Sequence, residues 1–192
     1  RKMKATVSLL MLVCLCSVTA CAQDMNGNHN HVTPAAASPD TQDWAKQRLA
    51  KSPRHQEWVK VKNGTREVNS FVVYPENKNK ATAVIVIHEI FGMSDWVQSL
   101  TDQLAEAGYV AIAPDLLSGL GPNGGGTSSL SGNAVGQAIR DLPRDQITAD
   151  LNAVAAYISK VPASNGKIVV TGYCWGGGES FRYATNNPNI KA

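Results

Sequence analysis

The chain has 192 residues, of which 43% are hydrophobic and four are cysteines. This length suits one domain, the hydrophobic fraction excludes a wholly disordered or collagen-like chain, and the cysteines are too sparse for a disulfide scaffold. The formal net charge of +3 comes from Arg1, Lys2 and Lys4, because the remaining basic and acidic residues are equal in number. No basic patch indicates binding to nucleic acid.

Residues 1–21 have the three-part layout of an export signal: a basic start, an apolar run and a few small residues. The apolar run, Val7–Cys16, is too short to cross a membrane, which takes about 20 residues. Residues 18–21 resemble a bacterial lipobox, in which Cys21 is lipidated and anchors the exported protein to a membrane. The alternative is ordinary cleavage at the Ala-Cys-Ala pattern of residues 20–22, which predicts a periplasmic or secreted protein.

Residues 22–55 are predicted to form a flexible tether followed by a short helix. The stretch 23–40 is polar and contains Pro, Gly and Asn without a periodic apolar face. A helix is expected from Asp40 or Thr41 to Ser52, with Trp44 and Leu49 as its apolar contacts. Pro53 ends this element.

The remainder, residues 56–192, is predicted to be an α/β domain. Strands at 57–62 and 67–74 flank Asn63-Gly64, a strong hairpin signal. Three apolar, β-branched runs that predict buried parallel strands follow, with helical periodicity between them, at 81–87, 109–113 and 167–171. This alternation favours a mostly parallel sheet with helices on both faces, and the Gly- and Ser-rich stretch 118–136 is expected to be a long loop.

A cysteine stands where the last predicted strand turns into a helix. Residues 172–176 read G-x-C-x-G, which matches the G-x-S-x-G nucleophile elbow with Cys174 in place of serine. A sharp turn projects the nucleophile above the sheet, and glycines at 172 and 176 avoid Cβ clashes there. The backbone N–H of Trp175 is then expected to face a developing oxyanion.

The first buried strand ends in His88-Glu89-Ile90, at the place where such folds supply a second oxyanion donor. The backbone N–H of Ile90 is the expected donor. Glu89 is expected to approach Cys174 and hold its thiol neutral, since like charges oppose thiolate formation. We expect His88 to pack or to anchor a loop. An H-E-x-x-H zinc site is excluded because position 92 is glycine.

Three motifs, at residues 88–92, 113–116 and 172–177, resemble the dienelactone hydrolase family of α/β-hydrolases in order and spacing. The resemblance covers residues 65–192. It implies hydrolysis of a small-molecule lactone or other carboxylic ester by a Cys-His-Asp triad, without a metal or organic cofactor. It also implies that Cys174 is the nucleophile, Glu89 the acidic residue beside it, and Ile90 and Trp175 the oxyanion donors.

The chain departs from the family pattern in two ways. The Tyr and Arg that bind the carboxylate of dienelactone are absent after residues 114–116, which favours another ester or lactone. No histidine follows Cys174, so residues 56–192 are interpreted as the N-terminal part of a larger domain whose triad His and Asp lie beyond Ala192. Such a fragment is expected to be inactive and unstable alone, because its sheet ends on an open edge.

Two other functions remain open. One is a catalytically inert, lipid-anchored binding protein that has kept the fold, because fold does not guarantee function. The other is a serine-type relative that acts on carbohydrate esters or peptides, with Cys174 merely occupying the elbow. The sequence does not predict an oligomeric state.

Overall fold

The computed structural model describes residues 43–191, so the predicted export signal and most of the tether lie outside the described residues. The helices and strands follow in the order α1 (Asp43–Lys51), β1 (Gln56–Asn63), β2 (Arg66–Val73), β3 (Ala81–Ile87), α2 (Asp95–Glu106), β4 (Val110–Pro114), η2 (Pro122–Gly124), η3 (Thr127–Ser129), α3 (Asn133–Arg140), α4 (Arg144–Ile158), β5 (Ser164–Gly172) and α5 (Trp175–Asn186). None of the helices in this part of the chain is long and apolar enough to cross a membrane.

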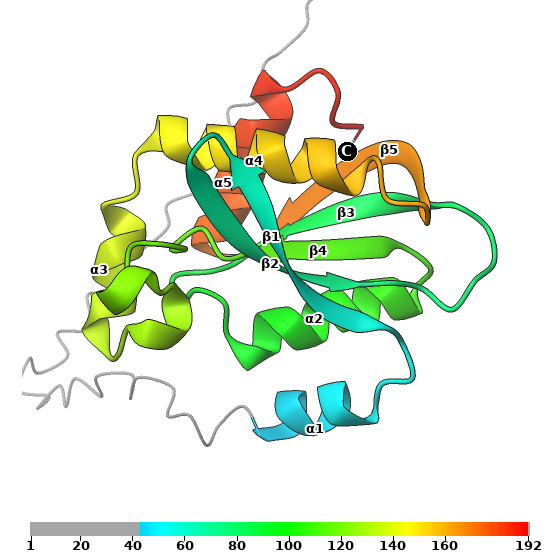
Figure 1. Ribbon diagram of the computed structural model, residues 1–192, viewed down its shortest axis with the longest axis horizontal. Helices are drawn as coiled ribbons and strands as arrows, with labels where there is room; N and C mark the ends of the chain where they lie inside the picture. Colours follow the sequence, from blue (N-terminus) through cyan, green and yellow to red (C-terminus); the bar gives the residue numbers. More distant parts are fainter. Residues whose placement is uncertain (1–42, 192) are drawn as a thin grey trace, which may run out of the picture. The chain divides into compact units, whose positions relative to one another are not determined.

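The strands form one sheet in the order β1-β2-β4-β3-β5 (Figure 1). Strand β3 pairs in parallel with β4 and β5, whereas β1, β2 and β4 pair antiparallel. The sheet is therefore mixed, with three parallel strands and an antiparallel ribbon of β1 and β2. Helices α1 and α2 cover one face, and α4 and α5 cover the other (Figure 1). The predicted α/β fold with helices on both faces is confirmed.

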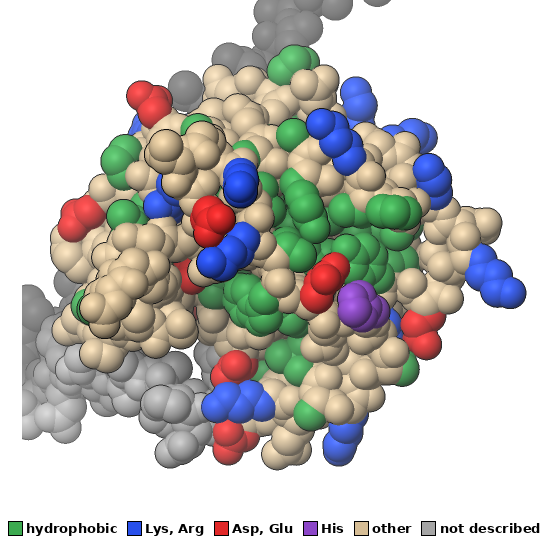
Figure 2. Space-filling model, in the orientation of Figure 1, with side chains coloured by type: hydrophobic (Ala, Val, Ile, Leu, Met, Phe, Trp, Pro, Cys, Tyr) green, Lys and Arg blue, Asp and Glu red, His purple; other side chains and the backbone are tan. Residues whose placement is uncertain are grey.

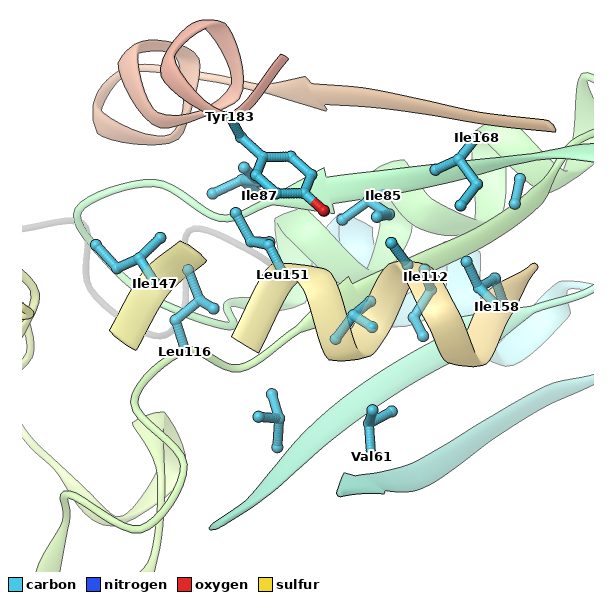
Figure 3. Close-up of a cluster of buried hydrophobic side chains, with 14 of the residues drawn as sticks. Val61, Ile85, Ile87, Ile112, Leu116, Ile147, Leu151, Ile158, Ile168 and Tyr183 are labelled. Carbon is cyan, nitrogen blue, oxygen red and sulfur yellow. The ribbon is translucent and has the colours of Figure 1, made fainter. Parts of the chain in front are cut away.

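Strand β3 is the centre of the core because both of its faces are buried. Ile85 and Ile87 face the cluster under α4 and α5, and Val84 and Val86 face the cluster under α2. On the first side, side chains from α4 lie against the sheet and Tyr183 of α5 lies over its end (Figure 3). Burial of such side chains stabilises the fold by about 1.5–3 kcal/mol each.

Strand β5 differs from the prediction of a third strand buried on both faces. It lies at the edge of the described sheet, and residues 169–172 are only partly buried. Its outer side makes one isolated parallel bridge, between Ile168 and Ile190, and the N–H of Lys191 donates to the Ile168 carbonyl at 2.9 Å. A strand needs a neighbour and a helix on each side to be buried fully, and within residues 43–191 β5 has one strand partner along its length.

Three local predictions also need correction. Trp44 is 50% exposed, and α1 instead buries Ala45 and packs through Leu49. The stretch 118–136 contains two short 3-10 turns and the first residues of α3. In the hairpin Asn63 pairs with Arg66, so the turn residues are Gly64 and Thr65, one position later than expected.

Two buried ion pairs tie the antiparallel ribbon and its approach to the helices. Arg54 binds Asp102 of α2 through two hydrogen bonds of 2.9 and 2.7 Å, and the bound carboxylate raises the pKa of the guanidinium. Arg66 of β2 binds Asp150 of α4 at 3.0 Å and also donates to the carbonyl of Leu116 at 2.9 Å. Removing one partner of such a pair costs about 3–5 kcal/mol, because the other charge stays buried.

The face over β1 and α4 carries an open apolar trough (Figure 2). It is lined by Val61 of β1, Tyr157 of α4 and Val161 just after α4, together with Lys60, Lys62 and Lys160.

Candidate active site

The turn between β5 and α5 has the geometry of a nucleophile elbow. Cys174 has φ 52° and ψ −121°, and it is exposed. A non-glycine residue in this region costs about 1–3 kcal/mol, and such strain is concentrated at functional sites. The helix begins at the next residue, and the Cys174 carbonyl accepts a hydrogen bond from the N–H of Gly177 at 3.0 Å. The thiol therefore stands above the end of the strand, at the start of a helix.

Two glycines make this turn possible. A Cβ atom on Gly172 would overlap the carbonyl group of Gly176, and one on Gly176 would overlap the carbonyl oxygens of Ile87 and His88. The backbone of α5 thus lies directly on the ends of β3 and β5. The predicted reason for the glycines is confirmed.

His88 is fully buried and holds the two segments of the site together. Its Nε2 accepts from the N–H of Leu116 at 3.3 Å, so its Nδ1 carries the proton that bonds the Glu89 carbonyl at 3.0 Å. Its ring stacks on Trp175, with centroids 5.6 Å apart and planes at 15°. Burial lowers the pKa of His88, which keeps the ring neutral. The predicted anchoring role is confirmed.

The register of β3 and β5 brings Glu89 and Ile90 to the same sheet edge as Cys174. Ile87 pairs with Gly172, so the residues that follow each strand emerge side by side. Glu89 is partly buried, and this burial raises the pKa of its carboxyl group. Within residues 43–191, the backbone N–H groups of Ile90 and Trp175 have no hydrogen-bond partner. Both are thus free to donate to a substrate oxygen.

Asp115 is the centre of a set of hydrogen bonds, here called the clamp, which joins it to Thr127 and Leu117 and which the sequence did not predict. Its carboxylate accepts from the N–H and the hydroxyl of Thr127, both at 2.8 Å, and from the N–H of Leu117 at 3.1 Å. The Thr127 hydroxyl oxygen in turn accepts from the N–H of Met93 at 3.1 Å. Thr127 also lies against Gly92, where a Cβ atom would overlap its side chain. The clamp braces the turn that carries Ile90. Asp115 belongs to the quoted 113–116 motif, but no pattern in the sequence links it to Thr127.

The structure thus gathers Cys174, Trp175, Glu89 and Ile90 at the carboxyl ends of two parallel strands. Within the described part of the chain, His88 and His55 are the only imidazoles. His88 is occupied on both nitrogens, and His55 lies at the start of β1. No group of three or more His, Cys, Asp or Glu side chains in these residues could hold a metal ion.

A strained cysteine between a parallel strand and a helix, with free N–H groups beside it, defines the α/β-hydrolase class of fold and site. The dienelactone hydrolase family model matches residues 68–192. The chain belongs to the dienelactone hydrolase family.

Individual relatives agree with this assignment. A candidate carboxymethylenebutenolidase of Yersinia pestis is 32% identical over 127 residues, which cover 66% of this chain and 47% of the relative. A similarly described protein of Escherichia coli is 38% identical over 112 residues, 57% of this chain and 40% of its own length. The crystal structure of a candidate dienelactone hydrolase from Klebsiella pneumoniae aligns with a TM-score of 0.63 at 27% identity, covering 72% of this chain and 57% of that one. The chain therefore spans about half the length of the curated relatives it matches.

Proposed function

We propose that the complete protein hydrolyses carboxylic esters or lactones through a thioester on Cys174. The observation that carries this proposal is the backbone of Cys174, a non-glycine residue held at φ 52° and ψ −121° at an exposed strand-to-helix turn. The surrounding structure maintains a costly conformation there, which favours a catalytic role over a packing role. Membership of the dienelactone hydrolase family supports the same reaction class.

In the first step, the Cys174 sulfur attacks the carbonyl carbon of the ester. A C–S bond forms, the carbonyl π electrons move to oxygen, and the N–H groups of Ile90 and Trp175 stabilise this oxyanion. Collapse of the intermediate breaks the C–O bond and releases the alcohol, which takes up the proton lost by the thiol. A lactone gives the same thioester with its alcohol still attached.

In the second step, water attacks the thioester, and the carboxylic acid and the Cys174 thiol are released. A histidine must accept and return the protons in both steps. Both nitrogens of His88 are engaged in hydrogen bonds, so it does not serve as this base. In the proposal the histidine and its acidic partner come from the part of the family domain that follows residue 192.

Glu89 is proposed to restrain the thiol between turnovers. It follows β3, the strand paired with β5, and partial burial raises the pKa of its carboxyl group. Whenever this group is ionised, its negative charge opposes formation of a Cys174 thiolate. The nucleophile would then be deprotonated only when substrate binding changes the position or charge of Glu89.

The test is steady-state hydrolysis of p-nitrophenyl acetate by the full-length protein and by its Cys174→Ala and Cys174→Ser variants. We expect Cys174→Ala to lower kcat by at least about 10³-fold, because loss of a nucleophile removes the covalent pathway. Iodoacetamide should inactivate the wild type and leave the Cys174→Ser variant chemically unmodified at the elbow. Undiminished turnover by a folded Cys174→Ala variant would refute the cysteine mechanism and favour an inert elbow.

A further inference from the structure

A second concave site lies where α2, the β1–β2 ribbon and the loop after β4 meet. Its cavity has a volume of about 390 Å³, within the range of small-molecule sites. The polar and aromatic residues that line this ribbon pocket are Trp58, Lys60, Asn69, Gln98, Asp115 and Ser128. The pocket does not include the elbow. Asp115 follows β4 and Cys174 follows β5, two strand positions or about 10 Å apart across the sheet.

The wall of the pocket contains the indole ring of Trp58, which is not part of the hydrophobic core. Trp58 is 51% exposed, and its ring packs on one side against Phe71, with centroids 5.4 Å apart. The partner ring holds the indole in place while much of its surface faces solvent. A rigid, half-exposed tryptophan offers a large amphipathic contact surface at little cost in conformational entropy.

The charged groups of the pocket already have partners. Lys60 forms an ion pair with Glu67 at 3.2 Å. The Asp115 carboxylate accepts three hydrogen bonds from Thr127 and Leu117. Lys60 is paired with Glu67, and the Asp115 carboxylate oxygens are occupied by three hydrogen bonds, so neither group offers an unpartnered contact to an ionic ligand.

The uncharged polar side chains, in contrast, have unused hydrogen-bonding capacity. Among residues 43–191, the side chains of Asn69, Gln98 and Ser128 have no hydrogen-bond partner. Two carboxamides and a hydroxyl present both donors and acceptors from three separate elements. Such groups match hydroxyls, which also donate and accept.

We propose that the ribbon pocket binds a neutral polyhydroxylated ligand, a sugar ring whose C–H face packs on Trp58 and whose hydroxyls bond Asn69, Gln98 and Ser128. The chemistry of the lining selects this class. The indole packs on the apolar face of the ring, the amides and the hydroxyl bond its edge, and the two charged groups, both already engaged, leave no free partner for an anion or a cation. This site is separate from the elbow and binds its ligand whether or not Cys174 is present.

The experiment is titration of the full-length protein with methyl β-D-glucopyranoside, methyl β-D-galactopyranoside and methyl β-D-xylopyranoside, followed by calorimetry and saturation-transfer NMR. Glucose 6-phosphate is the anionic comparison. We expect at least one neutral glycoside to bind, and we expect Trp58→Ala to weaken its Kd at least about tenfold. Gln98→Ala and Asn69→Ala should each weaken binding by a smaller factor.

The chain supplies matched controls. Trp44→Ala removes an equally exposed tryptophan on α1, and Gln103→Ala removes a glutamine from α2 outside the pocket. Both variants, and Cys174→Ala, should bind the glycoside as the wild type does. Failure of all three glycosides to bind would overturn the proposal. So would an unchanged Kd in a folded Trp58→Ala variant, or tighter binding of glucose 6-phosphate than of the glycosides at this site.

Discussion

The elbow and the ribbon pocket lie on the same domain and are built in opposite ways. At the elbow, backbone lies on backbone: Gly172 and Gly176 leave no space for a Cβ atom, and Cys174 is strained. In the ribbon, side chains define the pocket, and its Trp58 is half exposed. The hairpin turn of the ribbon, outside the pocket, is open, because no atom lies within 4 Å of the Cβ position of Gly64. Tight backbone packing leaves a motif in the sequence, whereas a pocket made of side chains from distant elements does not.

The largest expected effect of a single change is at the elbow. Gly176→Ala places a methyl group on the carbonyl oxygens of Ile87 and His88, so α5 must move away from the sheet. We expect the free energy of unfolding of the full-length protein to fall by about 3 kcal/mol or more. Urea denaturation followed by circular dichroism measures this change. The control is Gly178→Ala on the same helix, where no atom lies within 4 Å of the Cβ position. Equal stability of the two variants would contradict the close packing.

A smaller effect concerns His88 and its dependence on pH. Burial lowers the pKa of His88 in the folded protein, so below about pH 6.5 the unfolded chain takes up a proton that the folded chain refuses. The free energy of unfolding therefore falls as the pH drops below about 6.5, by at most about 1.4 kcal/mol per pH unit. In His88→Gln the melting temperature should fall less steeply between pH 7 and pH 5 than in the wild type.

The matched control for the substitution itself is His55→Gln, which removes an exposed imidazole just before β1. If His88→Gln kept the wild-type pH dependence, His88 would be charged or solvated in the folded protein, which contradicts a neutral ring with both nitrogens hydrogen-bonded.

The smallest effect is expected at the ribbon. Gly64→Ala meets no neighbouring atom, but Gly64 has φ +61°, which an alanine adopts only with strain. The expected loss in the free energy of unfolding is about 1 kcal/mol, measured by urea denaturation. A loss as large as that of Gly176→Ala would show that the hairpin turn is as tightly packed as the elbow.

Much of the fold could be predicted from the sequence. The run 81–87 matches β3 in both bounds, because an unbroken β-branched stretch favours a buried strand. The helical periodicity after this strand matches α2, which begins after Ser94, whose hydroxyl accepts from the N–H of Val97. The elbow was also predictable, because its glycines are required by local geometry at fixed spacing.

The rest could not be predicted because it depends on contacts between distant residues. The partial burial of β5 depends on its neighbours in the described sheet, which the composition of the strand does not encode. The clamp of Asp115 on Thr127 crosses a loop of irregular structure. Trp58 and Gln98 meet in one pocket only after the ribbon folds over α2. None of these contacts produces a periodic pattern in the sequence.

Acylation of Cys174 can be tested directly by mass spectrometry of the intact protein. Full-length protein mixed with p-nitrophenyl acetate and quenched in acid within milliseconds should gain the mass of one acetyl group, and peptide mapping should place that group on Cys174. Hydroxylamine should remove it, as expected of a thioester. An acetyl group on another residue, or an unchanged amount of acetylation in the Cys174→Ala variant, would show that Cys174 is not the nucleophile.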